Sequence, residues 1–208
     1  MATLDFLATV VLLSASGVLG PGPLFLASTL RATKRGTIAG IECAVGHTLV
    51  EFPLVVALAI GLQAFLQSAT DYVAIAGGAV LLVFAFLQLF QATKRFEFDR
   101  AKVPGPWTER NGIVIGAAFT ALNPFFIIWW ATVGAVLITE ASALGAFVGV
   151  LGMFAAHIWM DYAWLGGTAA LVGRSGKLVL GKWYRVLLVA FSLAMFYFGT
   201  SFILSAIV

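Results

Sequence analysis

The first long apolar segment of this chain contains the sequence Gly20-Pro21-Gly22-Pro23, and the fourth contains Asn123-Pro124. Proline lacks a backbone N–H and clashes with the preceding helical turn, and glycine adds conformational freedom, so both sequences predict a broken or bent helix. In lipid, the backbone groups freed by a break need partners from protein, water or a ligand. Paired interruptions in two halves of a chain are typical of the binding sites of secondary transporters.

The composition predicts an all-α integral membrane protein. Hydrophobic residues make up 62% of the 208 positions and charged residues 10%, whereas a soluble domain carries about 25% charged residues. A membrane-spanning helix needs roughly 20 apolar residues. Six segments qualify, at 4–30, 38–62, 72–92, 112–138, 143–172 and 186–207. The longest link is too short for a core of its own, so we expect one transporter domain over residues 1–208. A cleaved signal peptide is not expected, because no basic residue precedes the first apolar run.

The basic residues predict the orientation. All twelve Lys and Arg residues follow the first, third or fifth apolar segment. Because cytoplasmic loops retain Lys and Arg, we expect these loops in the cytoplasm and both termini outside. The net charge of +3 then reflects membrane topology, and a nucleic-acid partner is not expected because no basic face with interleaved aromatics is present.

Six spans divide into two sets of three, at about 1–92 and 112–208, with a cytoplasmic loop at 93–111. An odd number of spans per half means that the second half enters the membrane from the opposite side. This pattern predicts two inverted three-helix repeats, in which helices 1 and 4 are the interrupted ones.

Two His–acid pairs lie at membrane depth, in the second and fifth spans. His47 precedes Glu51 by four residues, and His157 precedes Asp161 by four, so each pair shares a helical face. A charged side chain at the bilayer centre costs about 2.5–3.5 kcal/mol, so these acids are functional-site candidates. Histidine titrates near neutral pH, which favours proton coupling through all four residues. Two alternatives stay open: buried ion pairs that only hold helices together, and ligands for a metal ion. Glu42, near the basic rim, is expected to pair with Arg35 or Lys34 instead.

The two breaks favour the binding of a carboxylate. Proline is preferred at the first helical position, so Pro23 and Pro124 can each restart a helix, and Asn123 is a suitable N-cap. The restarted helices should present N–H groups and a positive dipole end to an anion. The N–H groups in question belong to Leu24, Phe25, Phe125 and Phe126. The expected substrate-binding residues are therefore Gly20, Pro21, Gly22, Pro23, Glu51, Asn123, Pro124 and Asp161.

These motifs resemble those of a known transporter family. The sequence Gly20-Pro21-Gly22-Pro23, with Lys34-Arg35-Gly36 and the glycine-spaced second span, is similar to the opening of the LysE/RhtB amino-acid exporters. Asn123-Pro124 resembles their second signature, usually Asn-Pro-Lys, although Phe125 stands in place of the lysine. The resemblance implies efflux of amino acids or similar small zwitterions by proton antiport across the cytoplasmic membrane, without a cofactor.

Other functions are weighed against transport of amino acids. Relatives in the same superfamily export divalent metal ions, which is the main alternative. A thiol-exchanging electron carrier would need two membrane cysteines, and the chain has only Cys43. An enzyme is not expected, because no Ser or Cys nucleophile stands at a suitable spacing from a base. Glycine pairs such as Gly36 and Gly40 predict close helix contacts, within one chain or between two chains of a homodimer.

Overall fold

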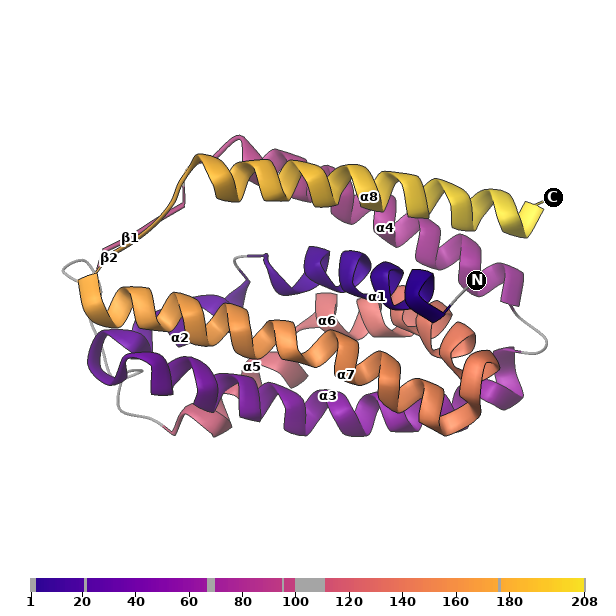
Figure 1. Cartoon of the computed structure of the whole chain (residues 1–208), viewed down its shortest axis with the longest axis horizontal. Coiled ribbons are helices and arrows are strands. Elements are labelled where there is room, and N and C mark those ends of the chain that lie inside the picture. Colours follow the sequence, from indigo (N-terminus) through magenta and orange to yellow (C-terminus); the bar gives the residue numbers. More distant parts are fainter. Residues whose placement is uncertain are drawn as a thin grey trace.

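The computed structural model describes residues 3–20, 22–66, 70–94, 96–99, 111–175 and 177–207. The architecture is helical, as predicted. The first half comprises α1 (Thr3–Val18), α2 (Pro23–Arg35), α3 (Thr37–Leu66) and α4 (Thr70–Ala92). The second comprises α5 (Gly112–Ala121), α6 (Pro124–Trp129), the π-helical turn η3 (Trp130–Gly134), α7 (Ala135–Ser175) and α8 (Lys182–Ile207). Figure 1 shows the helices lying roughly along one common direction.

A short β-ribbon at one end of the molecule was not expected. Strand β1 (Phe96–Asp99) pairs antiparallel with β2 (Lys177–Leu180), with Phe96 opposite Leu180 and Asp99 opposite Lys177. The ribbon ties together two of the basic loops that are predicted to be cytoplasmic (Figure 1). Its strands are only four residues long and lie in two of the links between the predicted spans.

Both predicted helix breaks are present. α1 and α2 meet at an angle of 68°. Gly22 is extended, with φ −77° and ψ −179°, and Pro23 is the first residue of α2, while Pro21 lies outside the described residues. In the second break α5 ends at Ala121, and α6 starts at Pro124. Here Asn123 is the N-cap, since its Oδ1 accepts the Phe125 N–H at 3.1 Å. Backbone chemistry thus predicts both interruptions correctly.

α7 consists of two helices separated by a reversal. Gly145 and Ala146 have non-helical backbone angles, and Ala146 has a φ of 49°. A Cβ added at Gly149 would collide with the carbonyl of Ala141. Two residues eight positions apart in a straight helix lie about 12 Å apart along its axis, so this contact requires the chain to turn back. The first part of α7 completes the fourth apolar segment, and the second part forms the fifth. The predicted start of the fifth segment at 143 was wrong, because the chain reverses only at Gly145 and Ala146.

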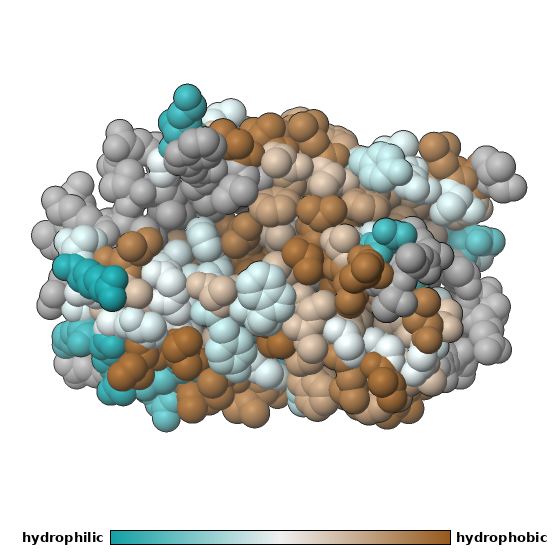
Figure 2. Space-filling model, viewed as in Figure 1, coloured by the Kyte–Doolittle hydropathy of each residue, from teal (hydrophilic) through white to brown (hydrophobic). Residues whose placement is uncertain are grey.

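Several helices are long and apolar enough to cross a membrane. Among the described residues these are the segments Thr37–Gly61, Phe125–Ser175 with its reversal, and Leu188–Ile207. The bent pair Leu4–Val18 and Pro23–Arg35 passes the same test as one broken span. Large hydrophobic side chains such as Ile60 (72% exposed) cover the outside of these helices, as Figure 2 shows for one face. A surface of this kind suits lipid contact, and the chain is a multi-pass membrane protein.

Corresponding segments of the two halves pack on each other. α3 packs along α7. α4 packs along α8, and these two helices form a pair at one side of the molecule (Figure 1). Glycines allow this close approach: a Cβ at Gly78 would lie 2.6 Å from the Gly199 carbonyl, and one at Gly40 would collide with the Leu165 carbonyl. Glycine contacts within one chain therefore explain part of the predicted pattern. The inverted repeat, the six-span count and a homodimer stay predictions.

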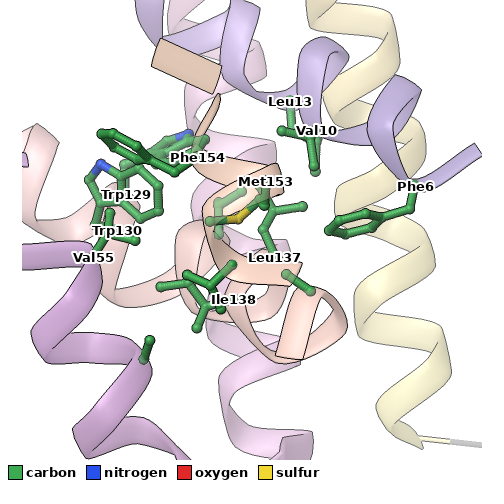
Figure 3. Packing of buried hydrophobic residues seen from close by; sticks show 14 of the residues in the cluster. Phe6, Val10, Leu13, Val55, Trp129, Trp130, Leu137, Ile138, Met153 and Phe154 are labelled. Atoms are coloured by element: carbon green, nitrogen blue, oxygen red, sulfur yellow. The ribbon is translucent and has the colours of Figure 1, made fainter. Parts of the chain in front are cut away.

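One of the two hydrophobic clusters among the described residues gathers around α1, η3 and α7. Figure 3 shows Phe6, Val10 and Leu13 of α1 on one side of this cluster and Trp129, Trp130 and Phe154 on the other. Leu137, Ile138 and Met153, from the two arms of the α7 reversal, lie between them. This packing closes the end of the bundle at which the reversal lies.

Candidate functional site

One cavity of about 350 Å³ lies between the two helix breaks. Its wall includes the centre of α3 and of α7, the end of α1, the start of α2, and one side of α4. The predicted site residues in its lining are Gly20, Gly22, Pro23, His47, Glu51, Asn123, His157 and Asp161. Pro124 follows Asn123 but is not a lining residue, and Pro21 lies outside the described part of the chain. Residues predicted separately from two halves of the sequence thus surround one space.

Glu51 is the centre of a buried polar cluster. Its Oε1 accepts a hydrogen bond from Trp130 Nε1 at 2.9 Å, and it lies 3.1 Å from His157 Nε2 and 3.2 Å from His47 Nε2. The side chain is only 1% exposed. We expected each histidine to share a helical face with its own acid. The structure shows that Glu51 of α3 contacts the histidines of both helices.

Asp161 faces the same histidines at a longer distance. Its Oδ1 lies 3.7 Å from His47 Nε2, and its Oδ2 lies 3.7 Å from His157 Nε2. His47, Glu51, His157 and Asp161, which we call the tetrad, form two possible ion pairs in one buried site. When both histidines are protonated, their charges balance the two carboxylates, as a low-dielectric environment requires.

The hydrogen bonds of Thr120 determine the tautomer of His47. The Thr120 hydroxyl donates to the Gly116 carbonyl at 2.8 Å, and its oxygen lies 2.8 Å from His47 Nδ1. A hydroxyl has one proton, so Thr120 accepts from His47 Nδ1–H. The other ring nitrogen, Nε2, faces Glu51 and Asp161, and its proton decides whether His47 is charged.

Several buried polar atoms of the cavity wall have no hydrogen-bond partner among the described residues. They are Ser14 Oγ, Glu51 Oε2, Trp129 Nε1, His157 Nδ1 and Asp161 Oδ2. A buried polar atom without a partner costs about 1–3 kcal/mol. Their presence around one cavity indicates a site that binds water or a polar ligand.

The sequence did not reveal the roles of the two adjacent tryptophans. Both tryptophans belong to the buried core, and they also contribute to the site. Trp129 and Trp130 are 6% and 1% exposed and line the cavity, whereas Phe125 is 55% exposed. The π-helical turn η3 begins at Trp130, and a Cβ at Gly134 would collide with the Trp130 ring. Such turns are frequent at functional sites, but no sequence pattern predicts them.

Gln88 of α4 was also missed. Its Nε2 donates to the Ser16 carbonyl at 3.0 Å, and its Oε1 lies 3.3 Å from Ser192 Oγ of α8. Ser16 lies two residues before the end of α1, where the break leaves carbonyls without helical partners. Gln88 thus satisfies a backbone group that the first break exposes inside the membrane, and it links the α4–α8 pair to α1.

Glu42 lies outside the cavity lining, as expected. It pairs with Arg35 at 2.8 Å, which confirms that prediction, and also with the buried Arg31 at 2.6 Å. These ion pairs hold α2 against the start of α3 at the end of the bundle that carries the basic loops.

The broken helices, the apolar exterior and the cavity that contains the buried tetrad together define a multi-pass membrane transporter. The chain belongs to the LysE type translocator family, whose family model matches residues 15–206. This match confirms the resemblance seen in the sequence and covers nearly the whole chain. The family is one of transporters. No curated protein and no solved structure matches the chain.

Proposed function

We propose that this protein exports amino acids, or similar small zwitterions, from the cytoplasm in exchange for protons. One observation carries the proposal: both helix breaks and the tetrad line a single cavity of about 350 Å³. That volume lies at the lower end of the usual range for small-molecule pockets. It is larger than a bare metal ion requires and suits a substrate of amino-acid size.

The tetrad is suited to exchange a proton for a substrate ammonium group. An antiporter needs a group that binds one or the other but not both, and a buried carboxylate has this property. We infer that Asp161 is this group, because its oxygens lie 3.7 Å from the histidine nitrogens and Oδ2 has no hydrogen bond. Three nitrogen atoms already lie within 3.2 Å of Glu51 Oε1, those of Trp130, His157 and His47. The role of Glu51 is therefore to hold the histidines in place.

His157 provides a route for the proton. Its Nε2 lies 3.1 Å from Glu51 Oε1 and 3.7 Å from Asp161 Oδ2. Its Nδ1 has no partner among the described residues, and the side chain lines the cavity. A proton that arrives on Nδ1 lets the ring release the one on Nε2 to Asp161, which is the ordinary relay behaviour of an imidazole. His47 is less suited, since Thr120 occupies its Nδ1.

The first break supplies the positive end of the site. Gly22, the N-cap residue of α2, has no side chain that could cap the helix, and Pro23 and Leu24 line the cavity. The helix dipole there favours an anion. The second break is less open than expected, because Asn123 already accepts the Phe125 N–H. We therefore assign the substrate carboxylate to the α2 side.

The position of the cavity is consistent with loading from the cytoplasm. Leu87 and Gln88, near the C-terminal end of α4, line it, and α4 leads into the loop that is predicted to be cytoplasmic. The core around Phe6 and Leu137 packs the opposite end. In this proposal the structure has the conformation that faces the cytoplasm, and export requires that core to open.

Transport in proteoliposomes tests the proposal. Vesicles that hold the purified protein are loaded with a panel of labelled amino acids, and the external pH is lowered. Efflux of the true substrate should accelerate, and a protonophore that collapses the gradient should abolish the acceleration. Amines that lack the carboxylate should not be carried. If an amine leaves as fast as its parent amino acid, or efflux ignores the gradient, the proposal is wrong.

A divalent transition-metal ion is the second candidate substrate, and one observation favours it. Ligand atoms of His47, Glu51 and Asp161 all lie within 4.8 Å of one another, and His157 Nε2 lies 3.1 Å from Glu51. Imidazole and carboxylate together suit Zn²⁺, Mn²⁺ or Ni²⁺, and Thr120 would orient His47 as outer partners of metal ligands do.

Metal binding to the purified protein decides between the two candidates. Isothermal titration with Zn²⁺, Mn²⁺ and Ni²⁺ is compared for the wild type and for Asp161→Asn, which removes a ligand charge without changing shape. Metal export predicts binding that this variant weakens and metal efflux from loaded vesicles. Amino-acid export predicts no such efflux.

A further inference from the structure

Two polar side chains of the cavity wall have no role in the tetrad. Trp129 is 6% exposed and Ser14 is 0% exposed. Neither Trp129 Nε1 nor Ser14 Oγ has a hydrogen-bond partner among the described residues, although both residues line the cavity. Each can donate a hydrogen bond, and an indole N–H can only donate.

The two donors lie at the same part of α1. A Cβ added at Gly17 would lie 3.8 Å from Trp129 Nε1, so the indole nitrogen sits against the α1 surface at Gly17. Ser14 lies three residues earlier in the same helix and hence on the same face, about one turn away. Gly20 follows Gly17 by another three residues and also lines the cavity. This face of α1 therefore leads from both donors directly into the first break.

The surroundings place this face beside the tetrad. The rings of Trp129 and His157 have centroids 5.8 Å apart. A ligand that contacts Trp129 Nε1 therefore has an imidazole of the tetrad close by. An amino acid carries its ammonium and carboxylate groups on the same carbon, so its two binding groups must be neighbours in just this way.

We propose that Trp129 Nε1–H and Ser14 Oγ–H, beside the N-terminus of α2, bind the substrate carboxylate. The inference rests on the proposed function and names the carboxylate subsite within it. The α2 terminus adds a partial positive charge, and the two side chains add directed donors in a water-poor site. A donor-only indole accepts nothing from an ammonium group, so the subsite also orients the zwitterion, with its ammonium end towards Asp161.

Direct binding measurements on purified variants test this subsite. Trp129→Phe keeps an aromatic ring and removes the N–H, and Ser14→Ala removes the hydroxyl. The matched control is Trp159→Phe, because Trp159 is 54% exposed and its N–H donates to its own helix at Ala156. The probes are a panel of proteinogenic L-amino acids and, for each one that binds, the primary amine that lacks its carboxyl group.

We expect Trp129→Phe to weaken binding of the amino acid roughly 10- to 100-fold, because a hydrogen bond to a charged group is lost. Ser14→Ala should weaken it in the same direction, and Trp159→Phe should change nothing. Binding of the amine should be the same in all variants, which a merely structural role of Trp129 would not predict.

Two results would overturn the inference, and they differ. If the wild type binds an amino acid and both Trp129→Phe and Ser14→Ala bind it equally well, the subsite is wrong while the proposed function stands. If the wild type binds no amino acid, the proposed function fails and the subsite fails with it. Should Trp129→Phe not fold, as judged by thermal unfolding in detergent, Ser14→Ala alone decides.

Discussion

Replacement of Glu51 by glutamine should uncouple transport from the proton gradient. The amide has the shape of the carboxylate, so its oxygen can still accept from Trp130 Nε1, 2.9 Å away in the wild type. Its NH₂ group would take the place of Oε2, which has no partner among the described residues. What the variant loses is the negative charge that faces His47 and His157 at 3.2 and 3.1 Å.

The size of the effect follows from these contacts. A hydrogen bond to a charged group contributes about 1.5–3 kcal/mol to stability, and a neutral one contributes about 0.5–1.5 kcal/mol. If the three contacts of Glu51 Oε1 each weaken by about 1 kcal/mol, the free energy of unfolding falls by about 3 kcal/mol. This agrees with the roughly 3–5 kcal/mol lost when one partner leaves a buried ion pair. His47 cannot adapt by changing its tautomer, because Thr120 holds its Nδ1 proton.

The assay is efflux from proteoliposomes at a series of external pH values, together with thermal unfolding in detergent. The wild type should export faster as the external pH falls, and Glu51→Gln should show a rate that no longer follows the gradient. Glu140→Gln is the matched control, because Glu140 does not line the cavity. Wild-type efflux with unchanged pH dependence in Glu51→Gln would refute the reasoning, because the histidines would then relay protons without the charge that holds them in place.

Two further predictions concern packing and orientation. Gly46→Ala should lower the unfolding temperature, because the added methyl group would collide with the Ile113 carbonyl at a cost of about 1–3 kcal/mol. The control is Gly152→Ala, whose methyl group would meet no atom within 4 Å. Equal unfolding temperatures for the two variants would contradict the close contact of α3 with α5. A cysteine in place of Ser142 should react with an impermeant thiol reagent added to intact cells, and one in place of Ser175 should not; the reverse pattern would invert the orientation that the basic loops predict.

The sequence alone predicted the parts of the fold that depend on local backbone chemistry. Pro23 acts through its ring and its missing N–H, and Asn123 acts through its side-chain oxygen. Both helices therefore start where expected. The family, the membrane location and the helical class likewise follow from composition and short motifs. The reversal at Gly145 and Ala146 lies inside the fifth predicted span, 143–172, because its backbone angles follow no local rule that the sequence shows.

The tertiary structure decided which partners the predicted site residues have. Helical spacing places His47 and Glu51 on one face, yet it says nothing about which residue of another helix lies opposite. The contacts of Glu51 with His157 and Trp130 depend on how α3 packs on α7 and on the π-helical turn. Those features arise from glycine contacts and side-chain shape across residues more than seventy positions apart. Sequence therefore determined which groups enter the membrane, and packing alone determined which of them meet, because a contact energy depends on distances that no local pattern contains.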